Sequence, residues 1–87
     1  MSIDRTRAMW PQIAAIVLER IQNGTYPPGG KIPSVVQLAN EFGVVNSTAQ
    51  RAMEAVKKEG LTRSEAGMGT FVLRPDEREA SADESAD

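Results

Sequence analysis

The chain has no cysteine and no histidine. Without cysteine it can form neither a disulfide nor a thiolate metal site, so its fold must depend on packing alone. Without histidine, acid–base, zinc and triad chemistry would depend on carboxylates and lysines. No pair of these is framed by apolar sequence in a way that suggests a tuned pocket. We therefore expect a protein that is not an enzyme and that has no metal or cofactor.

The chain is also short and has no long hydrophobic run. Its 87 residues, of which 40% are apolar, suffice for one small core, because domains usually comprise about 100–150 residues. We expect no second domain for a small-molecule effector in this chain. The first ten residues, MSIDRTRAMW, contain an acidic residue and no long apolar stretch, which argues against a signal peptide or a membrane anchor. A cytoplasmic protein is expected.

Positive charge is scarce overall, since the net charge is −2, but it is unevenly distributed. Residues 1–74 contain nine Lys/Arg against six Asp/Glu, a balance of +3, whereas residues 75–87 contain one Arg against six acids, a balance of −5. The second segment has no large apolar residue after Pro75, so burial cannot offset the entropy of ordering it. The sequence predicts a folded domain at 1–74 and an acidic, disordered tail at 75–87.

Apolar residues at helical spacing predict a first helix over residues 11–23. Pro11 suits its first turn, and Gly24 suits the position just past its end. Trp10 is expected to precede this helix and to pack on it, rather than to stack on a nucleic-acid base. The next segment, TYPPGGKIP, predicts an extended bend with at most a short strand at residues 31–32.

Two further helices are predicted close together in the chain. The earlier one begins at Ser34, because Ser34 and Gln37 can form a capping box, and it ends at Gly43. The later one ends at Gly60 and buries a stripe that consists of Ala49, Ala52, Met53 and Val56. Two short helices joined by a tight turn that contains glycine are typical of a helix-turn-helix.

A small hairpin is predicted after the third helix. Residues 61–73 read LTRSEAGMGTFVL, in which two β-prone runs flank AGMG, and these glycines can adopt the positive φ that a hairpin turn requires. The fold class is therefore expected to be mainly α with a small β-hairpin, a winged helix-turn-helix of three helices plus a wing.

The order of these elements resembles the N-terminal domain of the GntR family of bacterial transcription regulators. The resemblance covers about residues 10–73 and is carried by PQIAAIVLERIQNGTYPPGGKIPS, LANEFGV, RAMEAVKKEGL and GMGTFV. Each motif alone is common, but their order and spacing are specific. The resemblance implies a sequence-specific transcription regulator, with repression as the expected direction. Its expected partner is double-stranded DNA, bound as a homodimer on an operator at the bacterial nucleoid.

The resemblance also implies how DNA is contacted. The third helix, at about residues 46–59, would lie in the major groove, and the wing at residues 61–73 would lie at the minor groove. The matching positions in this chain are Ser47 and Thr48 in the opening turn of the helix, Arg51 one turn later, and Gly67 and Gly69 in the wing.

The chain departs from the family pattern at three expected contact positions and at one capping position. Val36, Asn46 and Gln50 stand where the family usually has arginine, and Val45 stands where a capping Ser or Thr is usual. Two interpretations remain open. Either the helix reads adenine, because Asn and Gln can each pair with adenine N6 and N7, or the winged helix has lost DNA binding and presents its valines to a protein partner.

Individual side chains also have structural alternatives. Asn46 either caps the third helix or reads a base, and both remain open. Gln50 has no evident local structural task, which favours base reading. Glu54 and Lys58 are expected to form a surface pair at i, i+4. Lys31, Lys57, Lys58 and Arg63 are candidates for phosphate contact. The expected DNA-binding residues are Lys31, Ser34, Asn46, Ser47, Thr48, Gln50, Arg51, Arg63, Gly67 and Gly69.

Overall fold

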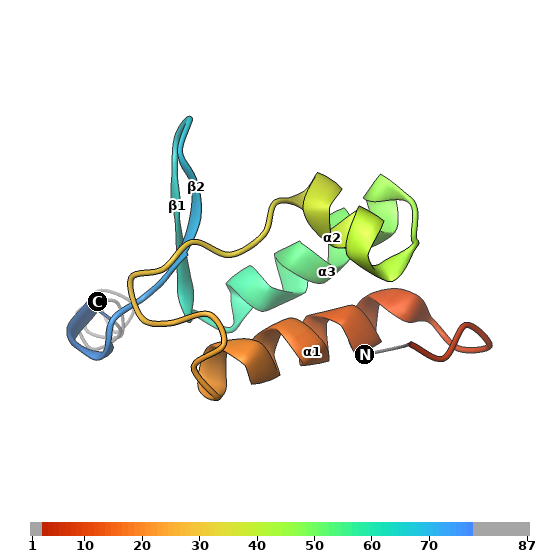
Figure 1. Ribbon diagram of the computed structural model, residues 1–87, viewed down its shortest axis with the longest axis horizontal. Helices are drawn as coiled ribbons and strands as arrows, with labels where there is room; N and C mark the ends of the chain where they lie inside the picture. The colour runs from red at the N-terminus through yellow and green to blue at the C-terminus, as the bar shows by residue number, and fades with distance from the viewer. Residues whose placement is uncertain (1–2, 78–87) are drawn as a thin grey trace.

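The computed structural model describes residues 3–77, which form three helices followed by a two-stranded hairpin (Figure 1). The helices are α1 (Met9–Gln22), α2 (Val35–Phe42) and α3 (Asn46–Lys58), and the strands are β1 (Thr62–Glu65) and β2 (Gly69–Val72). In Figure 1, α3 lies between α1 and α2, and the hairpin stands at the C-terminal end of α3. The predicted winged helix-turn-helix architecture is confirmed. Most of the predicted acidic tail, residues 78–87, lies outside the described residues.

Helix α1 begins two residues earlier than predicted. Its N-cap is Ala8, so Trp10 belongs to the first turn of the helix and does not precede it, as the sequence had suggested. Pro11 is the third helical residue, where its missing N–H removes no intrahelical hydrogen bond. The helix ends at Gln22, and Gly24, at φ +86°, redirects the chain into the bend at residues 25–33.

The termini of α2 are as predicted, and together they define the helix-turn-helix. The side chain of Ser34 accepts a hydrogen bond from the Gln37 amide, and the Gln37 side chain accepts one from the Ser34 amide, which completes the capping box. Gly43 ends the helix in the left-handed conformation at φ +65°. The Arg5 guanidinium donates to the carbonyl oxygens of Phe42 and Gly43, at 2.7 and 3.2 Å. The segment before α1 is thereby fastened to the turn.

The hairpin pairs Thr62 with Val72 and Glu65 with Gly69 in an antiparallel register. Its three-residue loop requires the positive φ that Gly67 adopts at +76°. The bend at residues 25–33 runs along β2, because the Ile32 amide donates to the Thr70 carbonyl oxygen at 2.9 Å. The wing is therefore joined to the rest of the domain through backbone hydrogen bonds as well as through its sequence neighbours.

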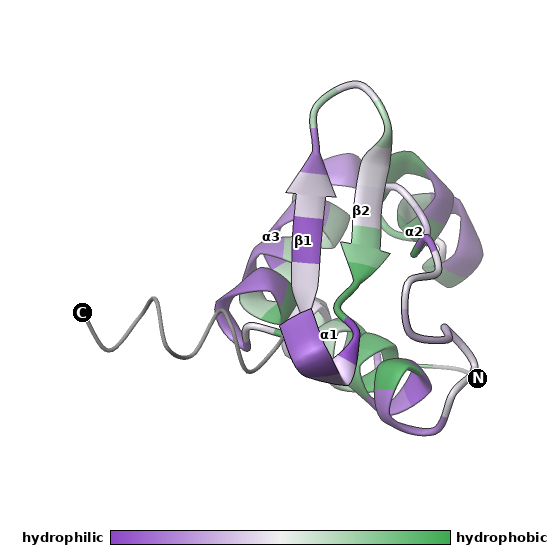
Figure 2. Ribbon diagram, turned by 90° about the vertical axis from the view of Figure 1, so that its left-hand side faces the viewer, coloured by the Kyte–Doolittle hydropathy of each residue, from purple (hydrophilic) through white to green (hydrophobic). Residues whose placement is uncertain are grey.

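The core lies between α1, α2, α3 and one face of the hairpin. Its fully buried large side chains are Ile13, Val17, Ile32, Leu38, Val56 and Val72. The predicted stripe on α3 is confirmed, since Ala49, Ala52, Met53 and Val56 are all buried. In Figure 2 the end of β2 is coloured as hydrophobic and points toward α1, so the wing closes one side of the core. Within residues 3–77 no helix is long and apolar enough to cross a membrane.

Arg20 connects α1, the bend and α2 in one polar cluster. Its guanidinium donates to Glu41 at 3.1 and 2.5 Å and to the Tyr26 hydroxyl at 2.7 Å. It also lies over the ring of Phe42, 5.6 Å from the centroid. Hydrogen bonds from Arg20 hold the pKa of the Glu41 carboxyl below its ordinary value.

We predict that Glu41→Gln destabilises the fold at neutral pH and much less in acid. A carboxyl whose pKa is lower in the folded state stabilises the fold above its unfolded pKa of about 4.3, and that contribution is lost as the pH falls through the folded pKa. Urea unfolding of both proteins at pH 7 and pH 3 measures the difference. The control, Glu59→Gln, removes a carboxylate that has no ion pair with any other residue of 3–77. An equal deficit of Glu41→Gln at both pH values would contradict the coupling.

Candidate functional site

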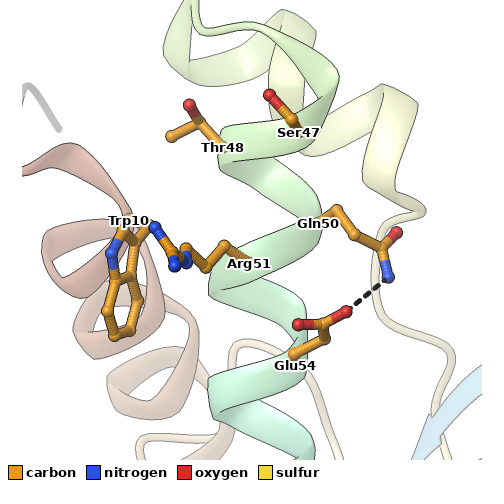
Figure 3. Close-up of a pocket in the computed structure, with 6 residues that line it drawn as sticks. All are labelled: Trp10, Ser47, Thr48, Gln50, Arg51 and Glu54. Atoms are coloured by element: carbon orange, nitrogen blue, oxygen red, sulfur yellow. Dashed lines mark hydrogen bonds between the residues drawn. The ribbon is translucent and has the colours of Figure 1, made fainter.

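The exposed surface of α3 has two edges that point in different directions. Burial of the Ala49 stripe leaves Ser47, Gln50 and Glu54 along one edge, at i, i+3 and i+7. Thr48 and Arg51 lie along the other edge, toward α1. Figure 3 shows this division, with Gln50 directed away from α1 and Arg51 directed at Trp10 of α1. One short helix thus presents five polar side chains, of which all but Glu54 were predicted to contact DNA.

Gln50 has a local contact that the sequence did not indicate. Its side-chain amide donates to the Glu54 carboxylate at 3.3 Å, one turn along the helix. The predicted pair of Glu54 with Lys58 was wrong, because no such ion pair occurs in the described part of the chain. Gln50 and Lys58 each lie four residues from Glu54, so helical spacing allows Glu54 to contact either of them. The side-chain rotamers decide which contact forms. The contact is exposed and long, so Gln50 remains free to exchange it for another partner.

Asn46 does not cap α3, which removes one of its two interpretations. The N-cap is Val45, and no side chain accepts a hydrogen bond from the amides of the first turn. Asn46 is the first helical residue and is exposed, as is Ser47, while Thr48 is half-buried. The Thr48 and Ala49 amides donate to the Val45 carbonyl oxygen, whereas the Asn46 and Ser47 amides have no acceptor among residues 3–77. The opening turn of α3 therefore presents these two amides and three polar side chains on the surface, an arrangement that favours anions.

The wing, the bend and α3 enclose an open groove of about 510 Å³, the wing groove. Residues from all three segments and from the start of α2 line it, including five that the sequence predicted: Lys31, Ser34, Gln50, Gly67 and Gly69. Lys57 of α3 also lines it. Side chains that are distant in sequence, and that were predicted separately, therefore share one concave surface.

Gly69 shapes the wall of this groove. A Cβ atom at Gly69 would lie 2.5 Å from Cε of Lys31, so the lysine chain lies directly against the glycine backbone. The backbone at Gly69, with φ +123°, is also one that side chains rarely allow. Gly67 differs, since a Cβ atom there would meet nothing within 4 Å. The backbone at the tip of the wing is therefore open to an approaching molecule.

Arg63 does not join the other predicted residues. It lies opposite Phe71 in the hairpin register, with its guanidinium 5.1 Å from the centroid of that ring. It pairs with the carboxylates of Glu65 and Glu77, the second at 3.2 Å. Two carboxylates compensate its charge on the hairpin, and its contact with phosphate stays a prediction.

Trp10 is the site residue that the sequence interpretation missed. Its ring faces the guanidinium of Arg51, which lies 5.7 Å from the ring centroid (Figure 3). Both side chains line a second open hollow, of about 350 Å³, together with Ser47, Thr48, Gln50 and Glu54. No sequence signal links Trp10 to Arg51, because only the packing of α1 against α3 brings them together.

Three large apolar side chains are exposed among residues 3–77. Val36 is the second residue of α2, Val45 precedes α3 and Met68 lies at the tip of the wing, and they are 55%, 66% and 63% exposed. All three belong to the segments that border α3 and the wing groove. The departures from the family pattern at Val36 and Val45 are therefore surface features rather than parts of the core.

Comparison with protein families gives a match over residues 11–72 to the model of bacterial regulatory proteins of the gntR family. The chain is 33% identical over 72 residues to a histidine utilization repressor from Pseudomonas putida, which covers 83% of this chain and 29% of that protein. It is 42% identical over 69 residues to an HTH-type transcriptional regulator from Rhizobium meliloti, which covers 79% of this chain and 28% of that protein. The chain therefore spans less than a third of the length of these two relatives.

Solved structures agree with the fold. The AraR DBD in complex with operator ORR3 superimposes with a TM-score of 0.68 at 33% identity, covering 74% of this chain and 77% of that one. A GntR family transcriptional regulator from Listeria monocytogenes gives a TM-score of 0.79 at 25% identity, covering 97% of this chain and 74% of that one. The first of these similar domains was solved on DNA.

We predict that Val45→Ser stabilises the domain, because a serine side chain at the N-cap accepts a hydrogen bond from an amide that now has no such partner. The expected gain in unfolding free energy is about 0.5–2 kcal/mol. Val36→Ser is the matched control, since it replaces a valine of similar exposure that lies inside a helix that is already capped; its expected change is within about 0.5 kcal/mol. Urea titrations followed by circular dichroism measure both. Equal changes in the two variants would contradict the capping argument.

Proposed function

The chain belongs to the gntR family of bacterial regulatory proteins, and on this premise we propose that it regulates transcription by binding double-stranded DNA. The observation that carries the proposal is the wing groove, which gathers Lys31, Ser34, Gln50 and the wing glycines on one concave surface beside α3. The similar AraR domain in complex with an operator supports it. The family description names regulators, in agreement with the expectation that the chain is not an enzyme.

In the proposed complex α3 enters the major groove with its first two turns. Gln50 is the main base-reading residue, because its amide can exchange the exposed contact with Glu54 for a bidentate pair with adenine. Asn46, which does not cap the helix, is available for the same chemistry. Ser47 and Thr48 contact phosphate beside the free amides of the helix N-terminus. Specificity thus shifts from guanine, which arginine would favour, toward adenine.

In the proposed complex the wing and the bend contact the sugar-phosphate backbone of the DNA beside α3. Lys31 and Lys57 line the wing groove with their charges exposed, which suits them to bind phosphates. Gly67 allows the backbone of the wing tip to approach the minor groove, since no side chain stands in front of it. Glu54 and Glu65 line the two hollows that Gln50 shares and oppose phosphate by repulsion, so binding is expected to be modest, while the lysine contacts make it depend on salt.

Three further properties follow from the family assignment and belong to the same proposal. Repression is the expected direction of regulation, as in the histidine utilization repressor of Pseudomonas putida. The protein acts in the bacterial cytoplasm, at the nucleoid when bound. It pairs as a homodimer on an operator whose half-sites lie about one helical turn apart. Folded residues 1–74 and an acidic tail at 75–87 remain the proposed organisation.

The proposal is tested by titrating a fluorescein-labelled duplex of mixed sequence with the full chain at several salt concentrations. For three to five phosphate contacts, the logarithm of the association constant should fall with the logarithm of salt with a slope of about −3 to −5. A module that binds proteins through Val36, Val45 and Met68 would give no salt-dependent binding of the duplex. That result would overturn the proposal.

A second prediction separates base reading from phosphate contact. Gln50→Ala should relax the preference at one base position and cost about 1–3 kcal/mol on the preferred site. Lys31→Gln keeps the chain that lies on Gly69, and should weaken binding to all sequences alike while it reduces the salt slope by about 1. Selection from a randomised duplex pool, followed by titration of the selected site, measures both effects. An unchanged preference in Gln50→Ala would assign base reading to another residue, with Asn46 the next candidate.

A further inference from the structure

Arg51 is held in place without having its charge compensated. Its guanidinium lies over the Trp10 ring, 5.7 Å from the centroid. Within residues 3–77 it forms no ion pair and donates no hydrogen bond, whereas Arg20 pairs with Glu41 and Arg63 with Glu65. A guanidinium that stacks on a ring keeps the N–H groups at its rim directed outward and free to bind another group.

The groups around Arg51 suit a negatively charged oxygen ligand. Arg51 and Thr48 are three residues apart on the α1 edge of α3, so the hydroxyl and the guanidinium lie on the same face one turn apart. The first-turn amides of α3, which no side chain caps, lie at the same end of the helix. The remaining charged group of the hollow, the Glu54 carboxylate, lies on the other edge of α3 with Gln50 (Figure 3).

We propose that Trp10 is a positioning residue for Arg51, and that Arg51 and Thr48 form a binding site for one phosphodiester of the duplex on the α1 side of α3. The inference rests on the proposed function. It extends the DNA-binding surface to α1, a helix that carries none of the proposed base-reading residues. The ring restricts the rotamers of Arg51 before DNA arrives, so less side-chain freedom is lost when the phosphate binds. The two edges of α3 then have separate tasks, base reading at Gln50 and backbone contact at Arg51.

The coupling between the two residues is measured with a double-mutant cycle on the full chain, using a fluorescein-labelled duplex selected by the wild-type protein from a randomised pool. Arg51→Ala should weaken binding of all duplexes and reduce the salt slope by about 1, as expected for one lost phosphate contact. Trp10→Leu should weaken binding by about two- to fivefold at low salt, in line with an exposed cation–π contact. In the Arg51→Ala background the same replacement of Trp10 should have no further effect.

A conservative variant and a spectroscopic signal distinguish positioning from a structural role. Trp10→Tyr keeps a ring at this position and should restore most of the affinity, and it also serves if Trp10→Leu does not fold. Trp10 is the only tryptophan of the chain, so its emission should change on addition of the unlabelled duplex with the same midpoint as binding. Thermal unfolding of each variant provides the control for stability.

The outcomes separate this inference from the function on which it rests. If the wild-type protein binds no duplex in a salt-dependent manner, the proposed function fails. If it binds, but Arg51→Ala leaves the salt slope unchanged, no phosphate is bound at Arg51 and only this inference is overturned. Additive losses in the cycle, or tryptophan emission that is constant through the binding transition, would refute the positioning role of Trp10.

Discussion

Burial of one face of α3 is the constraint on which the rest of the structure depends. Ala49, Ala52, Met53 and Val56 face α1 and α2, and the small alanine side chains let those helices approach closely. A helix rotates by about 100° per residue, so fixing this stripe also fixes which residues face outward. The Gln50 edge and the Arg51 edge are therefore consequences of core packing. No additional interaction is needed to direct them.

The wing illustrates how a weak element acquires a definite position. A two-stranded hairpin is marginal by itself in water, but Val72 and Leu73 are buried in the core, and the bend donates the Ile32 amide to Thr70. At Lys31 the bend thus pairs with the edge of the sheet at β2, as a very short third strand would. Because Lys31 belongs to this edge, the same interactions that hold the wing also place a cation beside the wing groove.

The distribution of charge on the proposed DNA surface favours discrimination between sequences over high affinity. Lys57 and Arg51 are cations on α3, and Lys31 is a cation on the bend beside it. The carboxylates of Glu54 and Glu65 line the same two hollows. Carboxylates near the proposed DNA surface reduce the sequence-independent attraction to phosphate. In the proposed complex, base contacts then account for a larger share of the binding free energy, which agrees with Gln50 and Asn46 in place of arginine at the positions proposed to read bases.

The sequence by itself determined the elements and most of their ends, because the signals for these are local. The Ser34 capping box, the glycine at the end of α2, the apolar stripe of α3 and the glycines of the hairpin each act over a few residues. It also predicted Lys31, Ser34, Gln50, Gly67 and Gly69 separately as DNA-binding residues. Only the tertiary structure decided that these five share one groove, that Arg63 is neutralised by Glu65 and Glu77, and that Trp10 faces Arg51. Most of these contacts join residues far apart in the chain, and all of them depend on how the elements pack and which rotamers the packing permits, which no local pattern in the sequence specifies.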